Sequence, residues 1–91
     1  MERQRKRLTE ENIDEVKEQP GVYELFEKGA KEPDYIGSTD DLNRRLTEHV
    51  GEGYRSFKIE RTGSTRRARS IEKELIKKKQ PVRNKIKYAY A

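Results

Sequence analysis

The sequence contains no cysteine. Disulfide bonds and cysteine-bound zinc are therefore excluded, and packing alone has to hold the core together. Long apolar runs are also missing, so no segment has the length of a membrane span or of the hydrophobic part of a signal peptide. These absences predict a soluble, cytoplasmic protein that does not insert into a membrane.

Large apolar side chains are scarce, because Leu, Ile, Val and Phe together number only 17 among the 91 residues. This fraction approaches that of disordered chains, which is the alternative interpretation. Interleaved opposite charges and periodic apolar residues favour a folded protein instead. A chain of this length forms one domain with a thin core. We expect a basic flexible arm at residues 1–8 and a single folded domain at residues 9–91.

Charged residues are abundant, and basic residues outnumber acidic ones. Lys and Arg number 22 against 17 Asp and Glu, which gives a net charge of +5 with 43% charged residues. A basic excess favours a polyanionic partner, either a nucleic acid or an anionic surface.

Turn and cap residues divide the chain into short elements. Thr9 is a candidate N-cap for a helix that runs to about Glu18, and Thr39 is a candidate N-cap for a helix that runs to about Val50. The order predicts an α/β (α+β) fold with a small three-stranded, largely antiparallel sheet flanked by helices. The expected strands are residues 22–27, 35–38 and 57–60, the last helix is residues 66–79, and an extended tail at residues 82–88 could add a strand.

One carboxylate lies on the wrong side of the last helix. At about 100° per residue, Glu72 falls inside the apolar stripe that contains Ala68 and Leu75, whereas Glu74 points away. A carboxylate on a core-facing stripe is costly unless it is paired. Glu72 is therefore either a salt-bridged structural acid, or a metal ligand or general acid/base at the edge of a cleft.

The middle helix has a similar anomaly. His49 lies within its apolar side, Arg45 lies on the border and Arg44 faces solvent. His49 could be a packed core residue and Arg45 a surface residue with a buried stem, or both could serve a site. The apolar side of this helix is expected to consist of Leu42, Leu46 and Val50.

The tyrosines and the clustered basic residues can also each be interpreted in a structural or a functional way. Tyr23 and Tyr35 could simply be strand-forming residues that cover a thin core. The basic residues of the last helix could form a solvated face, or they could follow a phosphate backbone. These basic residues include Arg66, Arg67, Arg69 and Lys77.

Five elements in order resemble the GIY-YIG nuclease family over residues 20–85. They are Gly21-Val22-Tyr23, Tyr35-Ile36-Gly37, the helix with Asp41-Leu42, Arg45-Leu46 and His49, the helix with Glu72, and the terminal Pro81-Val82-Arg83-Asn84. The closest similarity, in part, is to the nicking domain of the bacterial excision-repair nuclease subunit. Ser38 and His49 depart from that branch, which tends to have lysine and tyrosine there, and resemble free-standing members of the family.

The resemblance implies a metal-dependent endonuclease that hydrolyses DNA phosphodiester bonds. Glu72 would be the one protein ligand of a Mg²⁺ or Mn²⁺ ion, Tyr23 would be the general base with help from His49, and Arg45 would grip the scissile phosphate. Tyr35 would bond the phosphate or the water, and Asn84 would anchor the tail. The implied catalytic residues are thus Tyr23, Tyr35, Arg45, His49, Glu72 and Asn84.

The implied partner is DNA, including branched or damaged DNA, with a partner protein or a homodimer supplying specificity. The alternatives are a catalytically silent nucleic-acid-binding module of the same fold and a protein-interaction domain. The residues expected to contact DNA are Gly37, Ser38, Arg44, Arg66, Arg67, Arg69 and Lys77.

Overall fold

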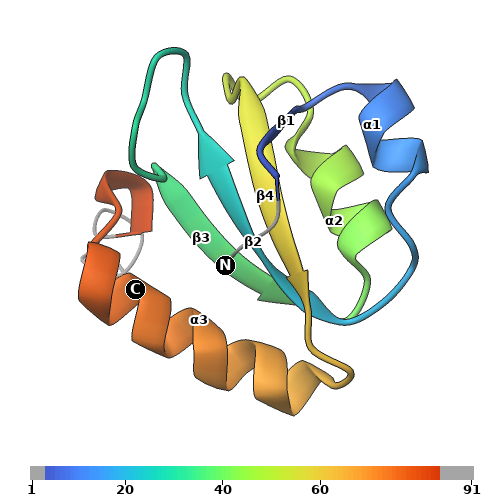
Figure 1. Ribbon diagram of the computed structural model, residues 1–91, viewed down its shortest axis with the longest axis vertical. Helices are drawn as coiled ribbons and strands as arrows, with labels where there is room; N and C mark the ends of the chain where they lie inside the picture. The colour runs from blue at the N-terminus through green and yellow to red at the C-terminus, as the bar shows by residue number, and fades with distance from the viewer. Residues whose placement is uncertain (1–3, 85–91) are drawn as a thin grey trace.

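The structure is a computed structural model that describes residues 4–84 of the chain. Within these residues, four strands and three helices form a single layer of sheet with helices on both sides (Figure 1). None of the helices in this range is both long and apolar enough to cross a bilayer. The elements are β1 (Lys6–Arg7), α1 (Glu10–Asp14), β2 (Gly21–Phe26), β3 (Tyr35–Thr39), α2 (Leu42–His49), β4 (Ser56–Arg61) and α3 (Thr65–Lys79).

The sheet is antiparallel throughout, with the strand order β1-β4-β2-β3. It has four strands, so the predicted number of three was wrong. The fourth strand comes from the expected arm, where Lys6 pairs with Phe57 and Arg7 with Ser56. A two-residue strand of exposed bases has no apolar alternation, which explains why the sequence did not indicate it. β2 lies in the middle of the sheet, and β3 is an edge strand.

Alternating residues of β2 supply two separate cores, and helices lie on both faces of the sheet (Figure 1). Tyr23 and Leu25 pack with α1 and α2 on one face of the sheet, whereas Val22 packs with α3 on the other. All six residues of β2 are buried, because helices cover both faces at this position. The strand therefore holds Tyr23 rigidly below the surface.

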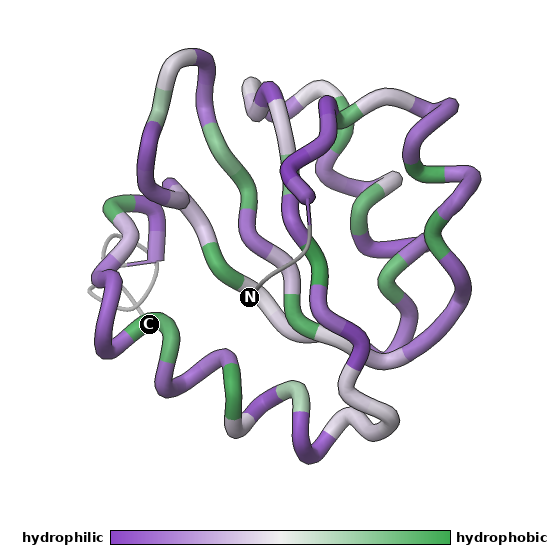
Figure 2. The backbone as a smooth tube through the Cα atoms, viewed as in Figure 1, coloured by the Kyte–Doolittle hydropathy of each residue, from purple (hydrophilic) through white to green (hydrophobic). Residues whose placement is uncertain are grey.

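The predicted apolar stripe of α3 is confirmed. Ala68 is fully buried, and Ile71, Leu75 and Ile76 pack against Val22 and Ile36 of the sheet. Figure 2 shows these hydrophobic positions recurring along α3 between hydrophilic ones. This packing fixes the rotation of α3 about its axis, and with it the direction of Glu72.

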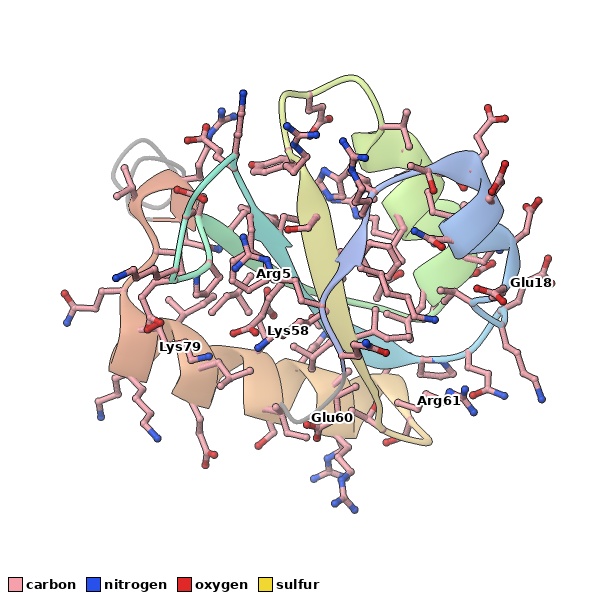
Figure 3. All side chains as sticks on the ribbon, turned by 45° about the horizontal axis from the view of Figure 1, so that its top comes forward. Arg5, Glu18, Lys58, Glu60, Arg61 and Lys79 are labelled. Atoms are coloured by element: carbon pink, nitrogen blue, oxygen red, sulfur yellow. The ribbon has the colours of Figure 1, made fainter. Side chains whose placement is uncertain are left out.

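A partly buried ion pair connects the end of α3 to the sheet. Lys79 Nζ lies 2.8 Å from Glu24 Oε2, and Glu24 is fully buried in β2. Lys79 lies near Lys58 and Arg5 on this side of the sheet (Figure 3), and both of those cations cover the ring of Phe26. Loss of Lys79 would leave the buried carboxylate of Glu24 without its counter-charge, which is strongly destabilising.

Two of the predicted helix starts can be compared with the observed caps. Thr9 Oγ1 accepts from the backbone N–H of Asn12, which confirms Thr9 as the N-cap of α1, although α1 ends at Asp14 rather than near Glu18. Asp41, not Thr39, caps α2 and accepts from the N–H of Arg44. Thr39 instead accepts from the N–H of Asp41 and so stabilises the turn before the helix.

Two further expectations were wrong in detail. Val50 follows the end of α2 and is 43% exposed, so it does not belong to the apolar side of that helix. Residues 82–84 are helical rather than extended. α3 ends at Lys79, because Gln80 adopts the left-handed conformation (φ 47°), and a new helical turn begins after Pro81. The rest of the predicted tail lies outside the described residues.

Candidate active site

Tyr23 is the centre of a hydrogen-bonded group at the end of α2. Its side chain is 1% exposed, and its hydroxyl lies 3.0 Å from His49 Nε2. Arg45 Nε donates to the same hydroxyl at 3.3 Å. α2 presents both residues to β2 because Arg45 and His49 are four positions apart, which is about one helical turn. His49 is buried and Arg45 half-buried, as the helical rotation predicted.

Aromatic rings enclose His49. The ring centroids of Tyr23 and Tyr35 lie 5.4 and 5.6 Å from that of His49, and Tyr54 meets the imidazole edge-on at 6.1 Å. Tyr23 and Tyr35 are also neighbours, at 6.2 Å between centroids. The two tyrosines therefore pack in the core, as one interpretation held, and they also meet the only histidine of the chain.

Gly37 makes room for the ring of Tyr23. The two residues are directly paired across β2 and β3. A methyl group at Gly37 would overlap Cζ and Oη of Tyr23, so the absence of a side chain is what allows the phenol to lie against the edge strand. The glycine thus acts through Tyr23, while the predicted contact of Gly37 with DNA stays a prediction.

The electrostatics keep Tyr23 protonated. Burial raises the pKa of Tyr23 well above its ordinary value, and Tyr35 and, more weakly, Glu72 add to this effect. Arg45 acts in the opposite direction, as expected from its charge, but does not outweigh burial. The hydrogen bond to Tyr23 in turn raises the pKa of Arg45, with a further contribution from Glu48. At neutral pH the site therefore contains a neutral phenol beside a fixed guanidinium.

Glu72 reaches the site from the opposite face of the sheet. Ser38 Oγ donates to Glu72 Oε1 at 2.8 Å, and Ser38 directly follows Gly37 in β3. Because β3 is an edge strand, groups from both faces can meet at its free side. Glu72 is half-buried and Glu74 is exposed, as predicted. Within the described residues Glu72 forms no ion pair, and its hydrogen-bond partner is Ser38.

A polar cleft of ≈ 400 Å³ opens between the start of α2 and the start of α3, beside β3. Arg44, Arg45 and Arg69 contribute its positive charge, and Ser38 connects it to Glu72. Arg44 is partly neutralised by Asp40, at 2.8 Å. The cleft is therefore suited to an anion that approaches Arg45 and Arg69, and Ser38 separates this position from Glu72. Its lining residues are Ser38, Thr39, Asp40, Arg44, Arg45, Thr65 and Arg69.

Asn84 closes the free edge of β3. Its side chain accepts from the backbone N–H of Ile36 at 2.7 Å and donates to the carbonyl of the same residue at 2.8 Å. Asn84 is 1% exposed, so these two bonds satisfy groups that water cannot reach. The expected anchoring of the chain after α3 is thus observed, and it fixes the strand that carries Tyr35, Gly37 and Ser38.

The predicted basic residues of α3 do not all face the same way. Arg66 and Arg69 line a second surface hollow, which continues from the cleft through Thr65 and Arg69. Lys77 follows on the same side by helical spacing, whereas Arg67 lines neither hollow. Lys73 also lines the second hollow, although it is not among the residues that the sequence predicts to contact DNA. Its spacing of four residues from both Arg69 and Lys77 was the signal that could have identified it.

Known proteins share both the sequence pattern and the fold. A sequence model of the GIY-YIG catalytic domain matches residues 19–87. This chain belongs to the GIY-YIG family. The predicted fold of a small sheet flanked by helices is thereby confirmed as that of a GIY-YIG domain. No curated protein sequence matches the chain significantly.

Solved structures of the GIY-YIG N-terminal endonuclease domain of UvrC from Thermotoga maritima are similar to this GIY-YIG domain. The form bound to magnesium as its catalytic divalent cation is 30% identical, with a TM-score of 0.68, and the match covers 79% of this chain and 90% of that one. A tyrosine-to-phenylalanine mutant with the catalytic divalent cation is 29% identical, with a TM-score of 0.68 and coverage of 79% and 89%. The predicted similarity to the repair branch is confirmed.

Gly37→Ala should destabilise the domain, because the new methyl group would overlap the ring of Tyr23. The added methyl would displace the ring of Tyr23, which we expect to lower the free energy of unfolding by about 1–3 kcal/mol. Chemical denaturation measures this loss. In a Tyr23→Ala background the same methyl should cost little, because the overlapping atoms are gone. Equal losses in both backgrounds would contradict the assigned role of Gly37.

Proposed function

We propose that this domain is a metal-dependent endonuclease that hydrolyses DNA phosphodiester bonds, by nicking a strand or by cutting at a branched or damaged structure. The observation that supports the proposal is that two hydrogen-bonded pairs, Arg45 with Tyr23 and Ser38 with Glu72, lie at neighbouring positions of β3 beside a basic cleft. Hydrolysis of a phosphodiester needs a water activated for attack and cations that stabilise the charge of the transition state. The side chains of Tyr23, Arg45 and Glu72 and a bound metal ion could supply both.

The donor set fits Mg²⁺ or Mn²⁺ at Glu72. Ser38 engages Oε1 of the carboxylate, and no hydrogen bond from another described residue takes Oε2. No group of three or more acidic, histidine or cysteine side chains gathers in the described part of the chain. Magnesium commonly binds through one or two carboxylates and keeps several waters, so a single glutamate suits it. Such an ion would act as a Lewis acid on the phosphate and on a bound water.

Each of the other side chains can be given a part. Arg45 would bond the scissile phosphate, for which a guanidinium fixed by Tyr23 and Glu48 is already oriented. Tyr23 would exchange protons with the attacking water, and Tyr35 would orient the phosphate or the water from the adjacent strand. Asn84 would hold β3 in place, which makes it a positioning residue.

DNA is proposed to follow one side of α3. Arg66, Arg69, Lys73 and Lys77 are spaced by three or four residues, so they form a single basic row. The row extends for about 16 Å along the helix, which is enough for several phosphates of one strand. It begins at the cleft, since Arg69 lines both hollows. Sequence preference and any partner protein or second copy are left to the substrate tests.

The DNA path is tested by Lys73→Ala. If Lys73 contacts a phosphate, its removal should weaken binding and should reduce the slope of log K against log[salt] by about 1. Lys78→Ala is the matched control, because Lys78 is also exposed but lies about 140° further around α3. Fluorescence anisotropy at several salt concentrations measures both slopes. The same slope change for the two variants would contradict the proposal that DNA follows this row of α3.

The proposed activity is tested with supercoiled plasmid and with nicked and branched duplexes. Purified protein with Mg²⁺ or Mn²⁺ should convert the plasmid to its relaxed form, and a chelator should stop the reaction. Binding that depends on salt, without cleavage of any substrate in either metal, would contradict the proposal. That result would identify the domain as a catalytically silent nucleic-acid-binding module.

A further inference from the structure

We propose that Glu52 is a positioning residue for the reaction, because it holds His49 in the one neutral form that can receive a proton from Tyr23. The inference rests on the proposed function, in which Tyr23 exchanges protons with the attacking water. Glu52 lies outside the five elements that resemble the GIY-YIG family, and its carboxylate gives each hydrogen bond in the group a direction.

Three side chains form a continuous hydrogen-bonded chain. Glu52 Oε1 lies 2.7 Å from His49 Nδ1, and His49 Nε2 lies 3.0 Å from the hydroxyl of Tyr23. The His49 side chain is 10% exposed, whereas that of Glu52 is 50% exposed. The imidazole thus connects a buried phenol to a carboxylate at the surface, and each of its two nitrogens has one partner.

The carboxylate determines which nitrogen carries the proton. An ionised carboxylate can only accept hydrogen bonds, so Nδ1 of His49 has to donate to Glu52. In the neutral ring Nε2 then has a free lone pair, which accepts from the hydroxyl of Tyr23. The bond from Arg45 Nε to the oxygen of Tyr23 agrees with this direction, because it leaves the phenolic hydrogen for His49.

The local sequence turns Glu52 back onto the end of α2. Gly51 and Gly53 flank it with φ angles of 92° and 98°, in the left-handed region that favours glycine. The backbone N–H of Glu52 donates to the carbonyl of His49 at 3.2 Å. The sequence predicts only that Gly51-Glu52-Gly53 ends the helix. In the structure the two glycines also direct the side chain of Glu52 toward His49.

The arrangement resolves a chemical difficulty of the site. Burial keeps Tyr23 protonated, so its hydroxyl can accept a proton only if it releases its own. As water attacks phosphorus, Tyr23 Oη takes one proton from the water and gives its proton to His49 Nε2. The water oxygen bonds to phosphorus, the bond from phosphorus to the leaving oxygen breaks, and the leaving oxygen takes a proton from solvent. Glu52 stabilises the imidazolium, which then loses its proton to solvent.

The first test determines which nitrogen of His49 carries the proton in the neutral ring. The chain has one histidine, so a long-range ¹H–¹⁵N correlation spectrum contains a single imidazole. At a pH above the ordinary titration range of histidine, the wild type should have its proton on Nδ1. Glu52→Ala should give a mixture of the two neutral forms, and Glu52→Gln, whose amide oxygen can still accept, should keep the wild-type form. A proton on Nε2 in the wild type would overturn the proposal.

The second test separates positioning from a general effect of charge. Glu52→Ala should lower kcat about tenfold with little change in KM, because the carboxylate acts on proton transfer and not on DNA. Glu18→Ala is the control, since it removes one exposed acid from the segment after α1 (Figure 3). In a His49→Ala background, Glu52→Ala should have no further effect. An effect of Glu52→Ala that persists without His49, or that matches Glu18→Ala, would overturn the inference.

The two proposals fail in different ways. If the wild type cleaves no DNA, the proposed function fails, while the imidazole spectrum still shows whether Glu52 and Tyr23 are bonded to His49 as described. If the wild type cleaves DNA and the Glu52 variants cleave equally fast, the function stands and the role of Glu52 is rejected.

Discussion

Replacing Glu72 with glutamine is expected to abolish DNA cleavage while leaving the fold intact. The amide oxygen can still accept from Ser38, so the position of the side chain should be preserved. The lost negative charge would remove the proposed ligand of the metal ion, which would supply several kcal/mol of transition-state stabilisation. We therefore expect cleavage to fall by about a thousandfold or more. Single-turnover nicking of a labelled duplex, together with thermal unfolding, measures both properties.

Glu74→Gln is the matched control for this prediction. Glu74 is on the same helix, two residues away, but is exposed and faces away from the sheet. It carries the same charge, so its substitution changes the overall attraction for DNA equally. Cleavage at the wild-type rate by Glu72→Gln, or equal losses in the two variants, would show that Glu72 has no special role.

Replacing Tyr23 with phenylalanine is expected to slow cleavage by about 10²–10⁴-fold, the usual contribution of a positioned acid or base. The ring would still fill its place against Gly37, so packing should change little. The hydroxyl would no longer connect Arg45 and His49, which should cost about 1 kcal/mol of stability for the lost hydrogen bonds.

Rates and affinities measured on the same duplex separate the effects in Tyr23→Phe. DNA binding should stay close to that of the wild type, because the hydroxyl is buried and the basic row of α3 is untouched. A variant that cleaves as fast as the wild type would exclude Tyr23 from proton transfer. A variant that fails to bind would indicate that the hydroxyl acts through the orientation of Arg45.

Helical rotation predicted which member of each candidate pair faces the site. It selected Glu72 over Glu74 and Arg45 over Arg44, and the structure has the selected members half-buried and the others exposed. The reason is physical, since an apolar stripe fixes how a helix lies on a sheet and thereby fixes the direction of every other side chain. The glycine and tyrosine positions of β2 and β3 were implied by the resemblance to the GIY-YIG family, and the pairing of Tyr23 with Gly37 became visible only in the structure.

Features that depend on contacts between distant parts of the chain could not be predicted from the sequence. β1 is defined only by its pairing with β4, and nothing in Lys6–Arg7 indicates a strand. The bond from Ser38 to Glu72 joins residues 34 positions apart. Glu52 was hidden for a different reason, because two glycines around an acid are typical of any loop, and only the turn of the backbone directs its carboxylate to His49.

A crystal of the protein soaked in Mn²⁺ tests the central claim most directly, through an anomalous difference map. We predict one peak at the Glu72 carboxylate, on the side of the cleft that contains Arg45, and no such peak in Glu72→Gln. A peak remote from Glu72, or an equally strong peak at this place in the glutamine variant, would contradict the account of the site.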